Sequence, residues 1–184
     1  MEDRVMKKYR SIIRAVLLAL LLALVLRSYL FASYVVDGES MEPTLYDGNL
    51  LMVNKVVYDW QGVNRGDVIV FHANEKEDYV KRVIGIEGDH IAFENDVLYV
   101  NGRRVPEPYL EELRPDDGRL FTRDFTLEGV TDQSVVPEGH LFVMGDNRRD
   151  SLDSRYFGFV PVESIVGKVD VRYWPVSQVD LQFK

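Results

Sequence analysis

Two side chains in this sequence are of types that could take part in chemistry, a serine hydroxyl and a lysine amine. Ser40 lies in a loop, residues 38–45, that contains glycine and proline. Lys81 interrupts an apolar run, residues 80–86, where loss of hydration would disfavour the ammonium form, lower the lysine pKa and free an amine to act as a base. Considered alone, each has a simpler explanation, since serine often caps a turn and lysine often protects an edge strand from aggregation.

A third segment, residues 144–158, is rich in groups that form hydrogen bonds. It contains Asp146, Ser151, Asp153 and Arg155 and directly follows an apolar strand. So many donors and acceptors in one turn suggest a network whose members satisfy one another. A polar surface loop is the alternative.

Other kinds of reactive site have little support. The chain has no cysteine, which excludes disulfides, a cysteine nucleophile and thiolate-bound zinc or iron–sulfur clusters. No two of the histidines, His72, His90 and His140, have the spacing of a helical metal site. A Ser-His-Asp triad stays open on composition alone. No glycine-rich phosphate loop occurs, and we predict neither a metal nor a cofactor.

The elements that must position these groups are predicted to be strands. Beyond residue 36, short apolar and β-branched runs alternate with turn residues, and no long helical period occurs. Asn101-Gly102 between two such runs predicts a hairpin with a type I′ turn. The candidate strands are Leu50–Val57, Asp67–Phe71, Val80–Ile86, Val97–Val100, Arg103–Val105, Leu141–Met144 and Ile165–Tyr173.

Residues 107–126 do not fit this pattern. They hold Pro108, Pro115, an Asp-Asp-Gly turn and several charges. We expect an excursion from the sheet or a small insert, most simply a solvated loop.

The first 31 residues differ from the rest in charge and hydropathy. They carry six basic and two acidic side chains, a net charge of +4, which leaves −12 for the remainder. Residues 15–26 are all apolar, and the stretch 12–31 reaches the roughly 20 residues that a spanning helix needs. Arg14 and Arg27 lie near its ends, where long side chains can reach the lipid headgroups.

A cleaved secretory signal is the alternative, since a basic start followed by an apolar core matches that pattern. No Ala-x-Ala site occurs between residues 26 and 36, which favours a retained anchor. The positive-inside rule then predicts a cytoplasmic basic tail at 1–11, a transmembrane anchor at 12–33 and an extracytoplasmic catalytic domain at 34–184. Membrane lipid is thus an expected partner, whereas the net charge of −8 argues against nucleic acid.

In their order and spacing, four segments resemble the motifs of the bacterial type I signal peptidases. They are Ser-Met-x-Pro-Thr-Leu at 40–45, Gly-Asp-Val-Ile-Val-Phe at 66–71, Lys-Arg-Val-Ile-Gly at 81–85 with Gly88-Asp89, and Gly-Asp-Asn-Arg…Ser-x-Asp-Ser-Arg-Tyr-Phe-Gly at 145–158. Each motif alone would be weak, but the ordered set covers most of the chain and outweighs the simpler explanations above. The compact body and single apparent span are similar to the Gram-positive-type members.

The resemblance implies a mostly β fold, in which an antiparallel β-sheet catalytic domain of the signal-peptidase and LexA-like type follows one N-terminal transmembrane helix. It implies a serine protease with Ser40 as the nucleophile and Lys81 as the general base. Ser151 would orient the base. The other matching residues would brace the site, and these are Asp146, Asp153, Arg155 and Arg82.

One departure from the family bears on the oxyanion hole. Many Gram-negative members have a serine two positions before the nucleophile, where this chain has Gly38. The hole would then use backbone N–H groups, including that of Ser40, and a compensating donor or water, because a lost oxyanion donor costs about 2.7–4 kcal/mol. Lysine rather than histidine at position 81 resembles the bacterial branch of the family.

The implied activity is removal of signal peptides from secretory preproteins, with cleavage after small residues of the Ala-x-Ala type through an acyl-enzyme. Ser40 follows the anchor closely enough to meet such sites where they leave the bilayer. Small apolar pockets would select the residues before the cut, with Met41 a candidate for their lining. No oligomeric state is predicted.

Three other interpretations stay open. One is a Ser-Lys protease with another substrate, such as a LexA-like self-cleaving repressor or a conjugation-system peptidase, although the anchor and the missing DNA-binding head argue against a repressor. A membrane-anchored, non-catalytic binding module would be expected to have lost Ser40 or Lys81. In a secreted soluble β protein, the basic and apolar N-terminal segment would be removed, and the mature chain would be absent from the membrane fraction.

Overall fold

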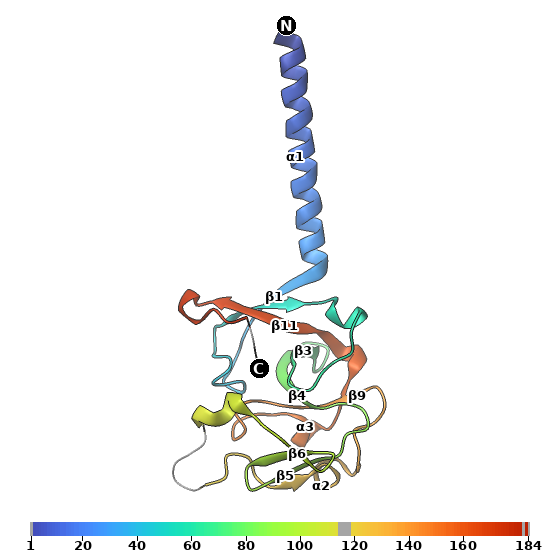
Figure 1. The fold of residues 1–184 in the computed structure, drawn as a ribbon, viewed down its shortest axis with the longest axis vertical. Coiled ribbons are helices and arrows are strands. Elements are labelled where there is room, and N and C mark those ends of the chain that lie inside the picture. The colour runs from blue at the N-terminus through green and yellow to red at the C-terminus, as the bar shows by residue number, and fades with distance from the viewer. Residues whose placement is uncertain (1, 114–118, 182, 184) are drawn as a thin grey trace.

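A computed structural model describes residues 2–113, 119–181 and 183 of the chain. Its first element, helix α1 (Glu2–Leu30), projects as a single rod from one end of the body (Figure 1). Residues 12–30 are long and apolar enough to cross a membrane, and none of that stretch is buried against the rest of the chain. Such exposure on all sides fits a helix surrounded by lipid rather than a core helix.

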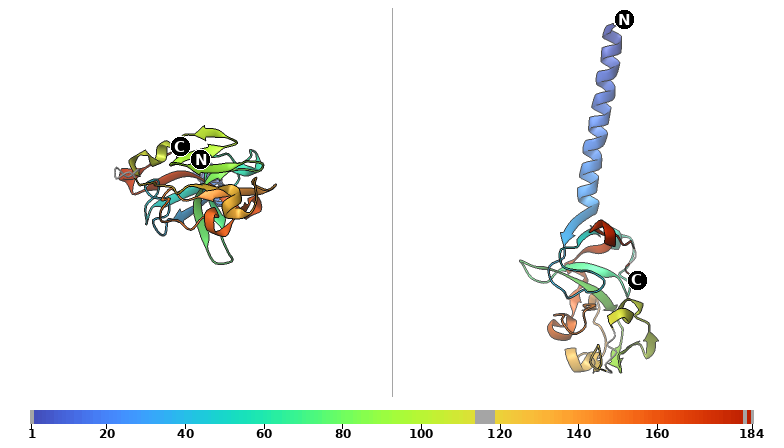
Figure 2. Two further views of the ribbon diagram at one scale, coloured as in Figure 1. Left: turned by 90° about the horizontal axis from the view of Figure 1, so that it is seen from below. Right: turned by 90° about the vertical axis from the view of Figure 1, so that its left-hand side faces the viewer.

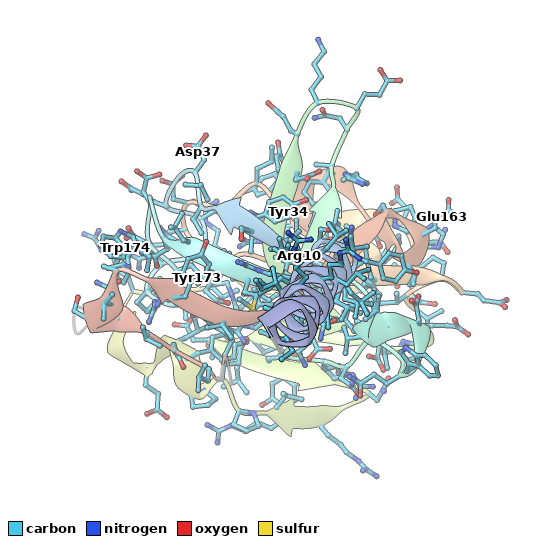
Figure 3. All side chains as sticks on the ribbon, turned by 90° about the horizontal axis from the view of Figure 1, so that it is seen from above. Arg10, Tyr34, Asp37, Glu163, Tyr173 and Trp174 are labelled. Carbon is cyan, nitrogen blue, oxygen red and sulfur yellow. The ribbon has the colours of Figure 1, made fainter. Side chains whose placement is uncertain are left out.

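The helix ends at Leu30, and strand β1 (Phe31–Val35) follows without a linker. Residues 31–33, which the sequence assigned to the anchor, therefore lie in this strand. The Lys55 N–H donates to the Leu30 carbonyl (2.9 Å), which ties the end of the helix to the sheet. Viewed along the helix axis, Tyr34 of β1 lies beside the foot of α1 (Figure 3). The anchor thus leads directly into the body.

The larger of two antiparallel sheets has the strand order β1-β2-β11-β3-β4-β9-β10. Its strand β3 is buried on both faces, because Val68 and Val70 join one core cluster while Ile69 and Phe71 join another. This explains why the sequence there is continuously apolar rather than alternating. The remaining strands of this sheet are β2 (Leu50–Asn54), β3 (Val68–His72), β4 (Asp78–Gly85), β9 (His140–Met144), β10 (Val160–Pro161) and β11 (Ile165–Trp174).

The smaller sheet, in the order β7-β6-β5-β8, lies at the end of the body away from α1 (Figure 1). It shares a core cluster with β9, in which Phe93 and Leu98 pack with Phe142. Asn101 and Gly102 both have positive φ values, 53° and 73°, so the predicted type I′ hairpin between β6 and β7 is confirmed. The strands are β5 (Ile91–Glu94), β6 (Val97–Val100), β7 (Arg103–Val105) and β8 (Phe125–Thr126).

Strand β2 stops at Asn54, before its predicted end at Val57. The Asn54 side chain accepts a hydrogen bond from the Val56 N–H (3.3 Å) and donates to Asp170 (2.9 Å). A local bond of this kind competes with the strand ladder, and the 3₁₀ helix η1 (Val57–Asp59) follows. The other predicted strands agree with the observed ones to within two residues at each end.

The described part of residues 107–126 contains short regular elements and buried side chains, which differs from a simple solvated loop. This part forms the 3₁₀ helix η2 (Pro108–Leu113) and strand β8, while residues 114–118 lie outside the described residues. A few isolated side chains anchor the segment, without the periodicity that would have predicted its burial. The buried members are Glu107, Leu110, Phe121 and Thr122.

Helices in the body are short. The predicted absence of a long helix beyond residue 36 is confirmed within the described residues, and the side view in Figure 2 shows α1 as the one long rod among them. The short helices are α2 (Leu127–Thr131), α3 (Ser154–Phe157), η3 (Val162–Ser164) and η4 (Val176–Gln178).

Candidate active site

The Ser40 hydroxyl and the Lys81 amine meet beside strand β4. Lys81 Nζ lies 2.8 Å from Ser40 Oγ, within hydrogen-bonding distance. The loop that carries Ser40 is fixed by Met41 and Leu45, whose side chains are buried in the core. The Leu45 N–H donates to the Met41 carbonyl (2.9 Å), so the chain turns immediately after the serine. Core packing therefore holds the hydroxyl against the strand.

The environment of Lys81 favours a neutral amine. The residue is 4% exposed, and burial lowers its pKa from 10.5 to about 8, while the carboxylates of Asp153 and Asp146 act in the opposite direction. Nζ also donates to the Val80 carbonyl (3.0 Å). With such a pKa, about a tenth of the amines are neutral at pH 7. A neutral amine within reach of a hydroxyl has the geometry of a general base with its nucleophile.

The next residue of β4, Arg82, forms a fully buried ion pair with Asp146. Arg82 Nε and Nη2 donate to the two carboxylate oxygens at 2.8 and 2.6 Å, and neither side chain is exposed. Burial opposes the guanidinium charge, but Asp146 and the other neighbouring groups together outweigh burial, so the pKa of Arg82 is raised. The Thr44 hydroxyl makes a short hydrogen bond to the same carboxylate. The pair therefore joins β4 to the loop that carries the nucleophile.

The turn after β9 holds Ser40 from the other side. The Asn147 N–H donates to the Ser40 carbonyl (3.1 Å), and Asn147 Nδ2 donates to the Glu39 carbonyl (3.2 Å). A side chain at Gly145 would collide with Ser151 and with the Ser40 carbonyl. Glycine is therefore required where the turn approaches the nucleophile loop.

Asp153 and Arg155 brace this turn. Asp153 accepts a hydrogen bond from the Gly145 N–H (3.0 Å) and caps the first turn of α3. Arg155 donates to both Asp153 oxygens, at 2.8 Å each, and to the Arg148 carbonyl (2.8 Å). The two predicted bracing residues thus fasten the turn to α3.

Ser151 lies in the same turn but does not hydrogen-bond to the base. It is 8% exposed, and its Oγ has no hydrogen-bond partner among the described residues. Lys81 Nζ hydrogen-bonds to Ser40 and to the Val80 carbonyl instead. A buried hydroxyl left unpaired costs about 1–3 kcal/mol, so this group is available to bound water or substrate. Its predicted role in orienting Lys81 stays a prediction.

A cleft of about 220 Å³ opens beside the Ser40–Lys81 pair. Its apolar lining includes Val36, Val80 and the predicted Met41. All three pack against one core cluster, so the cleft is a shallow extension of the hydrophobic core. Small apolar side chains fit such a lining, because they bury surface without displacing core residues.

A polar bridge spans the cleft between β1 and β4. The Tyr34 hydroxyl donates to Asp78 Oδ2 (2.9 Å), and His72 Nδ1 lies 2.6 Å from Asp78 Oδ1. Burial and the bond to Asp78 raise the pKa of Tyr34 to about 12, so the phenol remains a donor. In Figure 3, Tyr34 lies beside α1 while Asp37 projects outward at the edge of the body.

The backbone near Gly38 indicates which donor is free for an oxyanion. The Gly38 N–H already donates to Asp47 Oδ1 (2.9 Å), and a side chain at position 38 would meet no atom within 4 Å. Within the described part of the chain, no hydrogen bond is found for the Ser40 N–H. The Ser40 N–H is thus a backbone donor that the geometry leaves available.

Sequence reasoning missed two residues that support the site from the 107–126 segment. Glu107 pairs with the buried Arg148 at 2.5 Å, and the Tyr109 ring stacks on the Arg82 guanidinium at 3.7 Å. The carbonyl of Gly145 accepts from Arg148 Nε (3.1 Å). These contacts brace the turn after β9 and strand β4. No local pattern in the sequence predicts them.

The histidines form their side-chain hydrogen bonds with groups other than Ser40 and Lys81. None of them hydrogen-bonds to Ser40 or Lys81 in the described structure: His72 pairs with Asp78, and His140 Nδ1 lies 2.8 Å from the Glu138 carbonyl. Among the described residues, no three His, Cys, Asp or Glu side chains converge as metal ligands. The hydrogen-bonded pair beside this cleft is Ser40 and Lys81.

Comparison with known proteins identifies relatives of the whole chain. The family model described as "Signal peptidase, peptidase S26" matches residues 9–174. Over 160 residues the chain is 61% identical to signal peptidase I of Bacillus caldolyticus. The matched region covers 86% of this chain and 87% of that protein. The chain is 43% identical over 164 residues to signal peptidase IB of Staphylococcus aureus strain MRSA252, with 86% of each chain covered. A crystal structure of a signal peptidase I from Enterococcus faecalis V583 has a TM-score of 0.56 and 39% identity, covering 59% of this chain and 97% of that one.

Proposed function

The chain belongs to the signal peptidase family, peptidase S26, and on this premise we propose that it is a membrane-anchored serine endopeptidase that removes N-terminal signal peptides from secretory preproteins. One observation carries the proposed mechanism: buried Lys81 Nζ lies 2.8 Å from Ser40 Oγ. Among the described residues, Lys81 is the basic side chain that hydrogen-bonds to the Ser40 hydroxyl.

In the proposed reaction, neutral Lys81 takes the proton of Ser40 as Oγ attacks the carbonyl carbon at the cleavage site. The tetrahedral oxyanion forms beside the Ser40 N–H, which donates to it. Lys81 then gives its proton to the leaving amine, and the C–N bond breaks. The acyl-enzyme that remains is hydrolysed by a water whose proton Lys81 accepts, and the proton returns to Ser40.

The ion pairs near Lys81 limit how far the neighbouring carboxylates raise its pKa. Asp146 and Asp153 would both raise the pKa of Lys81. Because Arg82 and Arg155 are paired with them, much of their negative charge is offset. For Ser151 we keep the predicted role of orienting the lysine when a substrate fills the site, since its buried hydroxyl is unpartnered within the described residues.

The substrate would bind as an added strand. Residues 78–81 of β4 pair with β3 on one side, while β9 joins the other side only from Arg82 onward, so among the described strands that edge is open. An extended peptide can fill such an edge by main-chain hydrogen bonds. The adjoining lining of Val36, Met41 and Val80 would select small side chains, which supports cleavage after an Ala-x-Ala sequence.

The anchor supports this substrate class and a definite orientation. Helix α1 is basic at its start, so the positive-inside rule places that end in the cytoplasm and the catalytic domain outside. Signal peptides themselves span the membrane and expose their cleavage sites on the outer side. A nucleophile ten positions after Leu30 meets those sites at high effective concentration.

The test is cleavage of a secretory preprotein in detergent–phospholipid micelles. Wild type should trim it after a small residue, whereas Ser40→Ala and Lys81→Ala should lose activity by about 10⁴-fold or more. Lys76→Ala, a matched change at an exposed lysine of the adjoining loop, should keep full activity. Circular dichroism confirms that each variant folds.

Other outcomes point to other functions. Substantial activity in Lys81→Ala would mean that another base operates, and His72, His90 and His140 would return to consideration. A folded wild type that leaves the preprotein intact would make an anchored binding module the leading account.

A further inference from the structure

A second cleft adjoins the catalytic cleft, and the proposed mechanism makes no use of it. It measures about 270 Å³ and is lined largely by aromatic and aliphatic side chains. Three of these rings pack together, with centroids 6.2 to 6.5 Å apart: Phe71, Tyr79 and Phe157. With Leu152 they form what we call the aromatic recess.

The aromatic recess is continuous with the catalytic cleft. Tyr79 and Leu152 line both. Leu152 is 56% exposed and Phe157 is 40% exposed, although both belong to the braced segment that carries Ser151 and Asp153. Apolar surface fixed next to reacting groups marks a place where a ligand side chain gains by burial.

The pleat of β4 separates the two clefts by face. Val80 packs against the core cluster that includes Met41, whereas Tyr79 packs against the cluster that includes Phe71. Consecutive residues of a strand point to opposite faces. A substrate strand beside residues 78–81 follows the same rule, so its alternate side chains enter different clefts.

This alternation assigns each residue of the cleavage signature to a face. The first and third residues before the cut share one face. On that face Val36, Met41 and Val80 form the apolar lining of the catalytic cleft. The middle residue must then point to the other face. There it meets Tyr79 and Leu152, at the mouth of the aromatic recess.

We propose that the aromatic recess binds the side chain of the middle residue of the Ala-x-Ala signature and selects apolar side chains at that position. The inference rests on the proposed function and deepens it by naming a substrate feature. An aliphatic or aromatic side chain buries surface against Leu152 and Phe157. An acidic side chain loses hydration there, because Tyr79, Leu152 and Phe157 supply no charge to replace it. The imidazole in the lining, that of His72, already pairs with Asp78.

The experiment uses the full chain and preproteins that differ only in the middle residue: leucine, phenylalanine, alanine or aspartate. For wild type, kcat/KM should be about tenfold higher with leucine than with aspartate, the size of effect that a modest apolar contact gives. Leu152→Ala and Phe157→Ala should reduce this ratio to about twofold, and Phe157→Leu should preserve most of it. Val176→Ala, at an exposed residue that lines neither cleft, should behave as wild type.

The outcomes separate this inference from the proposed function. Equal cleavage of all four preproteins by wild type would overturn the inference and leave the peptidase assignment intact. A ratio unchanged in both Leu152→Ala and Phe157→Ala would also overturn it. If those variants instead changed selectivity for the residue after the cut, the recess would serve the mature side. Failure to cleave any preprotein would overturn the proposed function itself.

Discussion

Lys81 lies where its charged form is disfavoured, so activity should follow its deprotonation. Burial lowers the pKa of Lys81 to about 8, and only the neutral amine can accept the Ser40 proton. We expect kcat/KM for a preprotein to rise about tenfold per pH unit below pH 8 and to level off above it. The measurement is the cleavage rate between pH 6 and 10 in a chemistry-limited assay. A flat profile from pH 6 to 9 would rule out this base.

The lowered pKa of Lys81 also has a cost in stability. Because that pKa is about 8 when folded and 10.5 ordinarily, the unfolded chain binds more protons between these values. Wild-type stability therefore rises with pH across this window, and the full penalty applies below pH 8. Lys81→Met, which removes the charge and keeps most of the volume, should be more stable than wild type by about 3 kcal/mol at pH 7, at roughly 1.4 kcal/mol per pKa unit.

Thermal unfolding in detergent micelles at pH 7 and pH 10 measures this gain, which should shrink at the higher pH. The control is Lys76→Met, at an exposed lysine near the same strand, which should gain nothing at either pH. A Lys81→Met variant less stable than wild type at pH 7 would show that the site does not penalise the charge.

At this scale the sequence predicted the reacting groups better than their contacts. Ser40 and Lys81 are identifiable because each lies in a characteristic motif, and they meet across 41 residues of chain. The bridge from Tyr34 to Asp78 has no such motif, because a hydrogen bond between residues 44 apart depends only on tertiary structure. The predicted hydrogen bond between Ser151 and Lys81 also depends on tertiary structure. The motif fixes the place of Ser151 in the turn but not its rotamer.

Among the elements, the 107–126 segment supports the turn after β9 through one buried charge. Burial of Arg148 opposes its charge, but Glu107 and its other neighbours together outweigh burial and raise the pKa of Arg148. Glu107→Gln would leave the guanidinium without its counter-charge, and we expect a loss of about 3 kcal/mol in stability. We also expect a lower kcat with little change in KM, because the turn that holds Ser40 loses its support.

Unfolding temperature and steady-state kinetics test this expectation, with Glu111→Gln as the matched control. Glu111 lies in the same 3₁₀ helix but is exposed, so its neutralisation should change neither quantity. If Glu107→Gln and Glu111→Gln behave alike, the buried pair is not what braces the turn.

The elements that the sequence predicted well have a pattern that repeats along the strand or a turn with a fixed chemistry. The β6–β7 hairpin follows from Asn101-Gly102, and β3 follows from a run buried on both faces. Strand β8 escaped prediction because two residues carry no period. The burial of Leu110 and Phe121 escaped because each anchors the segment singly.

For the molecule as a whole, the arrangement of anchor and body decides what the dyad can reach. Helix α1 runs into β1 without a linker, and the catalytic cleft lies between β1 and β4. A nucleophile on a flexible tether would sample many depths, whereas here the strand that follows the anchor also forms one wall of the cleft. Under the proposed function, the membrane would therefore restrict the substrates to chains that emerge close to its surface.

The last prediction concerns which side of the membrane holds the cleft, and the absence of cysteine makes it directly measurable. Met6→Cys places a single thiol in the predicted cytoplasmic tail, and Ser134→Cys places one on an exposed part of the body. A membrane-impermeant maleimide should label Ser134→Cys in intact protoplasts and Met6→Cys only after lysis, because the basic start of α1 stays in the cytoplasm. Both variants should cleave a preprotein at the wild-type rate, which serves as the control for folding. The opposite labelling pattern would place the dyad in the cytoplasm, where exported cleavage sites do not occur, and would refute the proposed orientation.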